Sequence, residues 1–168
     1  ERLAARSPLN ADYRRTVGVS WYNLGEVLAA SGETAEALDC YERQSTIAAK
    51  LQAADPANEQ YRGDHAYALL RVGDMLAALG RPVAALARYR ASLALRAGDV
   101  RVDPGNLWKR SSLIEVHAKI SRVLVDRDPR RALAEASLAR TLMQATELAP
   151  GNAAIGGFFA QTYADVAD

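Results

Sequence analysis

The residues best suited to chemistry in this 168-residue chain are one cysteine, Cys40, and two histidines, His65 and His117. A histidine can activate a cysteine as a nucleophile, and both residue types bind zinc. Cys40, however, directly precedes Tyr41 within a helical pattern, and His117 stands where an earlier copy of the sequence has a large packing residue. Three such residues far apart in the chain are too few for a metal site. We therefore predict no catalytic residue, no metal, no cofactor and no enzyme activity.

The chain repeats itself with a period of 48 residues. The stretch from Trp21 to Gln44 recurs from Leu69 to Ser92, and a looser copy runs from His117 to Arg140. A Pro-x-Asn turn recurs as well, at residues 8–10, 56–58, 104–106 and 150–152. A fixed period of this size is typical of a stacked array, in which each unit buries its face against its neighbours. Such arrays usually present a binding surface rather than a reaction centre.

The residues that position this surface are predicted to be helical throughout. Alanine, leucine, arginine and glutamate are abundant, and apolar residues recur at helical spacing. The asparagine of each Pro-x-Asn turn is placed to cap a helix, and Gly32, Gly80 and Asp128-Pro129 mark the other turns. We predict an all-α fold of about seven helices, at residues 10–31, 33–55, 58–79, 81–103, 106–126 and 128–149 and from about residue 152 onward.

Two of the copies carry a family motif. The first reads Trp21-x-x-Leu24-Gly25-x-x-Leu28 followed by Ala37-x-x-x-Tyr41, and the second places Leu69, Val72, Gly73, Leu76, Ala85 and Tyr89 at the same positions. The third copy is degenerate, with His117, Ile120, Ser121 and Ala136. This pattern resembles the tetratricopeptide repeat (TPR) family. The resemblance implies a right-handed α-solenoid of antiparallel helix pairs that binds a peptide or partner protein in a concave groove.

The period departs from the family, whose unit has about 34 residues. About seven extra residues fall at the end of each second helix, and about seven at the start of the next first helix. Seven residues are nearly two helical turns, so each extension keeps its apolar face in phase. We therefore predict lengthened helices of about 20 residues rather than inserted loops.

We predict a single solenoid domain over residues 1–168, with repeats at 8–55, 56–103 and 104–149 and a closing helix at 150–168. Residues 1–6 match the end of a second helix, residues 49–54, and the closing helix has no partner after it. The expectation is therefore a fragment of a longer protein. An exposed closing helix would also allow a homo-oligomer to form.

By the family resemblance, the first helix of each pair lines the groove. The predicted partner-binding residues are Tyr22, Asn23, Glu26, Tyr67, Arg71, Asp74, Glu115, Lys119 and Arg122. These residues would offer hydrogen bonds, charge and tyrosine anchors to an extended peptide. Alternatively, and with equal weight, this face of the first helices is exposed to solvent and binds no partner.

Some residues are predicted to pack. Gly25, Gly73 and Ser121 recur where a pair of helices must approach closely, as do Ala37, Ala85 and Ala132. In the first pair, Trp21, Leu24 and Leu28 should pack against Leu38 and Tyr41. Arg14, Arg62 and Arg110 recur with the repeat. They could form a basic stripe for an acidic partner or a phosphate backbone, but we favour a structural role, in which they bond free carbonyls at a helix C-terminus or pair with Asp55 and Asp103.

The composition and charge of the chain limit the classes of partner that it is expected to bind. The chain is 49% hydrophobic and 24% charged, with a net charge of only +1, so no overall field favours nucleic acid or an acidic membrane. No signal peptide or membrane span is visible, and a single cysteine fits a reducing compartment. Arginine far exceeds lysine, which suggests a GC-rich bacterial genome. We predict a bacterial, cytoplasmic scaffold that binds protein or peptide, neither nucleic acid nor membrane. Self-association within a larger multidomain protein is the alternative, and an RNA-binding array is the least favoured.

Overall fold

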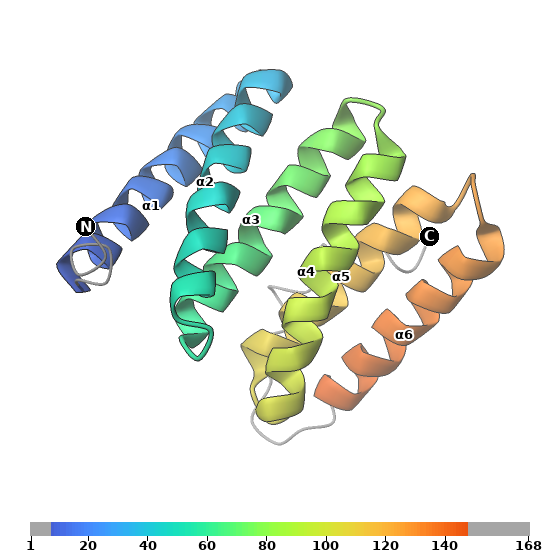
Figure 1. Cartoon of the computed structure of the whole chain (residues 1–168). Coiled ribbons are helices and arrows are strands. Elements are labelled where there is room, and N and C mark those ends of the chain that lie inside the picture. Colours follow the sequence, from blue (N-terminus) through green and yellow to red (C-terminus); the bar gives the residue numbers. More distant parts are fainter. Residues whose placement is uncertain (1–7, 148–168) are drawn as a thin grey trace. The chain divides into compact units, whose positions relative to one another are not determined.

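The computed structural model of the chain describes residues 8–147, and within them the side chains of residues 11–145. It contains the helices α1 (Pro8–Ala30), α2 (Thr34–Ala54), α3 (Glu59–Ala78), α4 (Pro82–Val102), α5 (Leu107–Leu124) and α6 (Pro129–Glu147) (Figure 1). Between residues 8 and 147 there is no strand, so this part of the chain is all-α as predicted. The seventh helix, predicted from about residue 152, lies outside the described residues.

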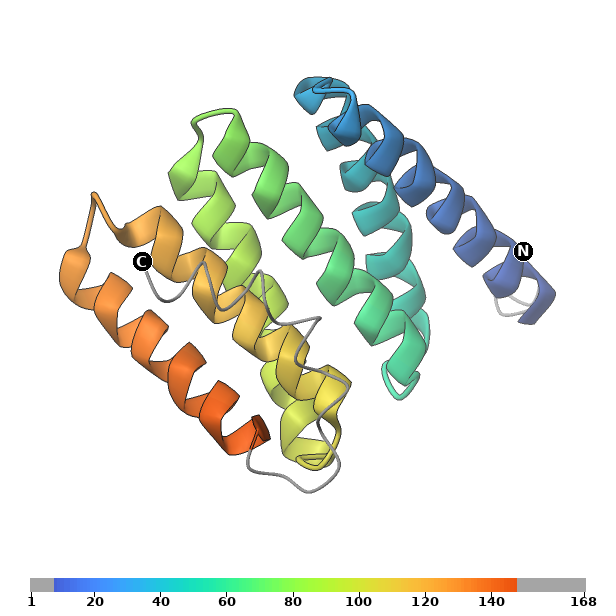
Figure 2. The ribbon, with the colours of Figure 1, turned by 180° about the vertical axis from the view of Figure 1, so that it is seen from behind.

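The chain divides into two compact units, Glu1–Ser92 and Leu93–Asp168, with the boundary inside α4. In the first unit, α2 packs against both α1 and α3. In the second unit, α5 packs against α6, as the view from behind shows (Figure 2). Ile114 of α5 forms a small core there with Ala139 and Met143 of α6.

Two of the predicted asparagine caps are confirmed. The side-chain oxygens of Asn58 and Asn106 each accept, at 3.2 Å, a hydrogen bond from the backbone N–H three residues later. Each bond satisfies one of the free amides at a helix start. The prediction for Asn10 is wrong, because α1 already begins at Pro8. Asn152 lies outside the described residues.

Glycine and proline mark the turns within the pairs. Gly32 and Gly80 have φ angles of +82° and +69°, a left-handed conformation that favours glycine at the end of a helix. Pro82 and Pro129 are the first residues of α4 and α6, where the missing N–H of proline costs no helical hydrogen bond.

The helices are lengthened, as the 48-residue period predicts. The first four contain 23, 21, 20 and 21 residues, which corresponds to about 30 Å each. The added residues extend regular helix on both sides of the short turn at residues 55–58. No loop is inserted among the described residues.

The recurring glycines of the first helices lie against tyrosine rings of the second helices. A Cβ atom on Gly73 would lie 2.5 Å from Cε1 of Tyr89, and one on Gly25 would lie 2.8 Å from Cε1 of Tyr41. Each glycine therefore makes room for a tyrosine ring of the second helix. In the third copy the tyrosine position holds Ala136, and Ser121 stands in place of the glycine.

Leu24, which is predicted to pack against the second helix of the first pair, keeps much of its surface exposed. Leu38 and Tyr41 are buried, but the side chain of Leu24 is 46% exposed. The equivalent residue on α3, Val72, is only 1% exposed. The two positions differ because α3 has α2 beside it, whereas no described helix precedes α1.

The recurring arginines donate to backbone carbonyls in two of the three copies. Arg110 reaches the carbonyl of Ala145, in the last turn of α6, at 3.4 Å, as the favoured interpretation predicts. Arg62 reaches the carbonyl of Pro56, in the turn before α3, at 3.1 Å. These bonds support a structural role for the two arginines.

Candidate functional site

Five of the predicted groove residues lie together in the first unit. The guanidinium of Arg71, on α3, donates to the carboxylate of Glu26 on α1 through both Nε, at 2.9 Å, and Nη2. Its Nη1 lies 3.4 Å from the carboxylate of Asp74, one turn along α3. The bond to Glu26 therefore joins α3 to α1, while the contact with Asp74 stays within α3. Both carboxylates are ones predicted from the sequence to face a ligand.

Both carboxylates also accept a hydrogen bond from a buried tyrosine. The hydroxyl of Tyr41 donates to Glu26 at 2.5 Å, and the hydroxyl of Tyr89 donates to Asp74 at 2.8 Å. The two tyrosines are 0% and 2% exposed. A buried phenol hydroxyl needs a hydrogen-bond partner. Glu26 and Asp74 supply this partner at equivalent positions of the first two copies, so both carboxylates have a structural role.

The remaining two members of the cluster are aromatic. The rings of Tyr22 and Tyr67 meet edge to face with centroids 5.6 Å apart, and their hydroxyl oxygens lie 3.5 Å apart. The guanidinium of Arg71 lies 5.9 Å from the ring centroid of Tyr67 and 5.6 Å from that of Tyr41, within cation–π range. Burial raises the pKa values of Tyr41 and Tyr67 above the ordinary range, so both hydroxyls stay protonated.

The network predicts that the first unit loses stability in acid. Burial raises the pKa of Glu26, but hydrogen bonds from Arg71 and Tyr41 outweigh that effect and hold the pKa below its usual 4.5. A group whose pKa is lowered on folding stabilises the fold above its unfolded pKa, and this contribution disappears as the pH falls through the folded pKa. We expect the free energy of unfolding to fall below a pH of about 4.5, and to fall less in Glu26→Gln. Urea unfolding across this pH range measures the difference. Glu42→Gln, at an exposed position of α2, is the control, and an equal effect of both variants would contradict the assignment.

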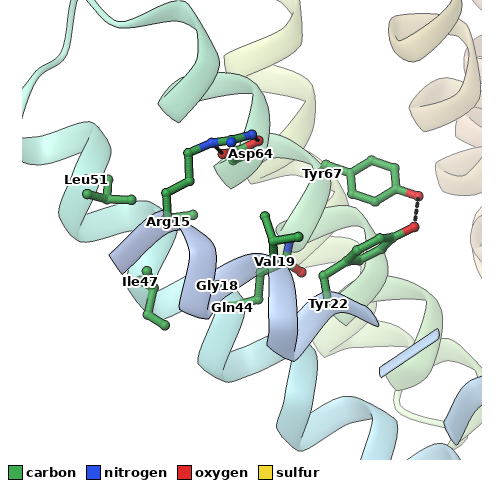
Figure 3. Close-up of a pocket in the computed structure, with 10 residues that line it drawn as sticks. Arg15, Gly18, Val19, Tyr22, Gln44, Ile47, Leu51, Asp64 and Tyr67 are labelled. Atoms are coloured by element: carbon green, nitrogen blue, oxygen red, sulfur yellow. Dashed lines mark hydrogen bonds and ion pairs between the residues drawn. The ribbon is translucent and has the colours of Figure 1, made fainter. Parts of the chain in front are cut away.

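Tyr22 and Tyr67 also line a cavity of about 290 Å³ between α1, α2 and α3 (Figure 3). Most of the remaining lining is apolar and is contributed by Gly18, Val19, Ile47, Ala48 and Leu51. Val19 is 38% exposed, whereas Gly18, Ala48 and Leu51 are buried. The cavity thus has a buried apolar interior and an exposed valine at its edge.

An ion pair lies beside this apolar lining. Nε of Arg15, on α1, is 2.7 Å from Oδ2 of Asp64 on α3, and a second contact of 3.3 Å joins Nη2 to Oδ1. The two side chains are about equally exposed, at 31% and 30%. Because Arg15 and Asp64 neutralise each other, the cavity carries no unbalanced charge.

One polar group of the cavity has no partner. Gln44, on α2, is only 8% exposed, and no donor in the described part of the chain reaches its Oε1. A buried amide oxygen without a donor costs free energy, on the order of 1–3 kcal/mol. Such a group marks a place where a ligand can supply the missing hydrogen bond.

The other predicted groove residues are placed differently. Asn23 is exposed on α1. Glu115, Lys119 and Arg122 lie on α5 in the second unit. There Glu115 is 4.0 Å from Nη1 of Arg96, which is itself buried.

The cysteine and the two histidines are buried or hydrogen-bonded within the fold. Cys40 is 4% exposed, and burial raises the pKa of its thiol, which makes it a poor nucleophile. Nδ1 of His65 lies 2.5 Å from Gln52, and Nδ1 of His117 lies 2.6 Å from Glu135. Between residues 8 and 147, no three histidine, cysteine or acidic residues gather where they would hold a metal ion. Nor is any helix in that range long and apolar enough to cross a membrane.

Sequence reasoning missed the residues that define the cavity: Arg15, Gly18, Gln44 and Asp64. Comparison of the copies contains a signal for two of them. Gly18 stands where the second copy has Ala66, and Gln44 stands where it has Ser92. The first copy thus has a smaller residue at position 18 and a longer polar residue at position 44 than the second copy. The sequence alone does not show that these two positions face one cavity.

Comparison of the chain with models of protein families, with characterised proteins and with solved structures found no match.

Proposed function

We propose that this chain is a non-catalytic module that binds a peptide or partner protein, with the cavity of the first unit as its recognition site. The observation that carries the proposal is the apolar cavity of about 290 Å³ beside Tyr22 and Tyr67, with a buried amide oxygen that lacks a donor. Ligand sites commonly combine apolar walls with a few polar groups that orient the ligand. A cavity of this size suits a peptide side chain better than a large cofactor.

The finer fold assignment is part of the same proposal. We infer a right-handed TPR-like solenoid with a seventh helix in residues 150–168 and a cytoplasmic, bacterial setting. The 48-residue repeat, the paired helices and the Gly25–Tyr41 and Gly73–Tyr89 contacts support the solenoid part of this proposal. In such an array the first helices face the partner, which is where Tyr22 and Tyr67 lie.

The test compares two exposed valines of α1. Val19 lines the cavity, whereas Val27 is 62% exposed and does not. Peptides are first selected from a random library displayed on phage, using the full chain as bait. Val19→Glu should weaken the binding of the selected peptides about tenfold or more, because a charge at the edge of an apolar cavity is desolvated on binding. Val27→Glu should leave the affinity unchanged. Calorimetric titration measures both variants.

A second candidate function, self-association, has its own observation. Tyr13, Leu24 and Val27 expose 70%, 46% and 62% of their surface on α1. Exposed apolar residues gathered on one helix often mark a protein contact. Light scattering at increasing concentration measures self-association, which Val27→Glu should weaken and Val19→Glu should not. If peptide binding is lost in Val27→Glu and retained in Val19→Glu, the peptide contacts this face and the cavity proposal is wrong. The contact predicted through the closing helix falls outside the described residues.

A further inference from the structure

The position of Gln44 differs in character between the three copies. In the second copy it is Ser92, whose buried hydroxyl donates to the carbonyl of Ala66 at 2.7 Å. In the third copy it is Ala139, which is 0% exposed and carries no polar side-chain atom. The fold therefore accommodates either a satisfied hydroxyl or an apolar residue at this position. Packing at this position therefore does not require a glutamine, or an amide oxygen without a hydrogen-bond partner.

Space beside Gln44 is also specific to the first copy. Gly18 has no side chain, and a Cβ atom there would make only ordinary contact, 3.4 Å from Cγ2 of Ile47. The equivalent residue of α3 is Ala66. A helical glycine is less stable than alanine by about 0.5–1 kcal/mol. The first copy thus combines two locally unfavourable residues, Gly18 and Gln44, around the same cavity.

Resting on the proposed function, we infer that the cavity of α1, α2 and α3 holds an indole ring, the tryptophan side chain of a bound peptide, whose N–H donates to Oε1 of Gln44. The apolar lining suits a large aromatic ring. An indole carries one donor and no acceptor, so it brings no second polar atom that would need a partner inside. A charged side chain gains nothing, because Arg15 and Asp64 already neutralise each other.

A small rearrangement accompanies binding. The amide oxygen of Gln44 is covered by the surrounding chain. Rotation about the last side-chain bond, which has a broad profile, turns it towards the cavity. The same rotation carries the Nε2 amide group to the covered side, so the indole N–H pairs with Oε1 only in this turned conformation of Gln44.

The experiment compares indole with indene, which has the same ring shape and no N–H. Both are titrated into the full chain while amide signals of Gly18 and Ile47 are followed by NMR. Indole should bind about fivefold more tightly than indene, the equivalent of one neutral hydrogen bond. In Gln44→Met, which keeps the length of the side chain and removes the oxygen, the two ligands should bind equally. Gln60→Met, at an exposed position of α3, should keep the preference for indole.

The outcomes separate this inference from the proposed function. Equal binding of indole and indene to the unaltered chain would overturn the inference, as would a preference for indole that survives in Gln44→Met. Failure of both ligands to shift the signals would overturn it as well. If selected peptides nevertheless bind in a Val19-dependent manner, the proposed function stands without the indole. Circular dichroism confirms that Gln44→Met is folded before its result is used.

Discussion

Replacing Gly73 with leucine should lower the free energy of unfolding by about 3 kcal/mol. The first carbon of the new side chain would lie 2.5 Å from Cε1 and 2.6 Å from Cδ1 of Tyr89, closer than such atoms can approach. Tyr89 cannot move away freely, because it is 2% exposed and its hydroxyl is bonded to Asp74. The substitution must therefore separate α3 from α4 or break that hydrogen bond. Urea unfolding followed by far-UV circular dichroism measures the loss.

Gly63→Leu is the matched control on the same helix. A Cβ atom on Gly63 would meet no atom within 4 Å. Leucine there should raise the stability by about 0.5–1 kcal/mol, because glycine is a poor helix former. Equal unfolding midpoints for Gly63→Leu and Gly73→Leu would show that the ring of Tyr89 does not pack on Gly73.

The third copy suggests how the clash can be relieved. There Ser121 occupies the glycine position, its hydroxyl donates to the carbonyl of Ala132 at 2.8 Å, and Ala136 replaces the tyrosine. The double variant Gly73→Ser with Tyr89→Ala should therefore lose less stability than the sum of its single changes. Such a coupling is expected for residues in direct contact.

Replacing Arg71 with methionine should cost about 2 kcal/mol of stability. Methionine keeps much of the apolar stem but removes the cation shared by Glu26 and Asp74. Because burial alone raises the pKa of Glu26, the carboxyl group should then titrate at a higher pH than in the unaltered chain. Urea unfolding measures the stability, and carbon NMR of the carboxyl group measures the pKa.

Arg43→Met controls for the loss of an arginine as such. Arg43 pairs with Asp39 at 2.7 Å on the surface of α2, where the two side chains are 54% and 59% exposed. Exposed pairs of this kind contribute at most about 1 kcal/mol and often nothing measurable. If Arg43→Met and Arg71→Met are equally destabilising, the network around Glu26 does not hold α1 to α3.

Much of the local structure follows from the sequence alone. The predicted helix limits agree with the observed ones within about two residues, because proline, glycine and asparagine act on the backbone next to them. The lengthened helices follow from a period that exceeds the family unit by nearly four turns, divided between two helices. The chain itself contains three versions of one pattern, so the pairing of the helices was also predictable.

The sequence also predicts which residues share a helix face, but not what those residues contact. Tyr22, Glu26, Tyr67 and Arg71 were predicted side by side as ligand contacts, and the first unit joins them to one another. Spacing along a helix tells which residues share a face. It does not tell whether a carboxylate on α1 meets a guanidinium on α3 or a ligand.

The limits, lengths and repetition of the six described helices could be predicted from the sequence, because they depend on interactions within a few residues. The tertiary structure decided which side chains neutralise each other, that Leu24 is exposed, and that Gly18, Gln44 and Asp64 surround one cavity. These features depend on distances between atoms of different helices. Replacing an alanine with a glycine, as at Gly18, changes such distances without changing the helical pattern of the sequence.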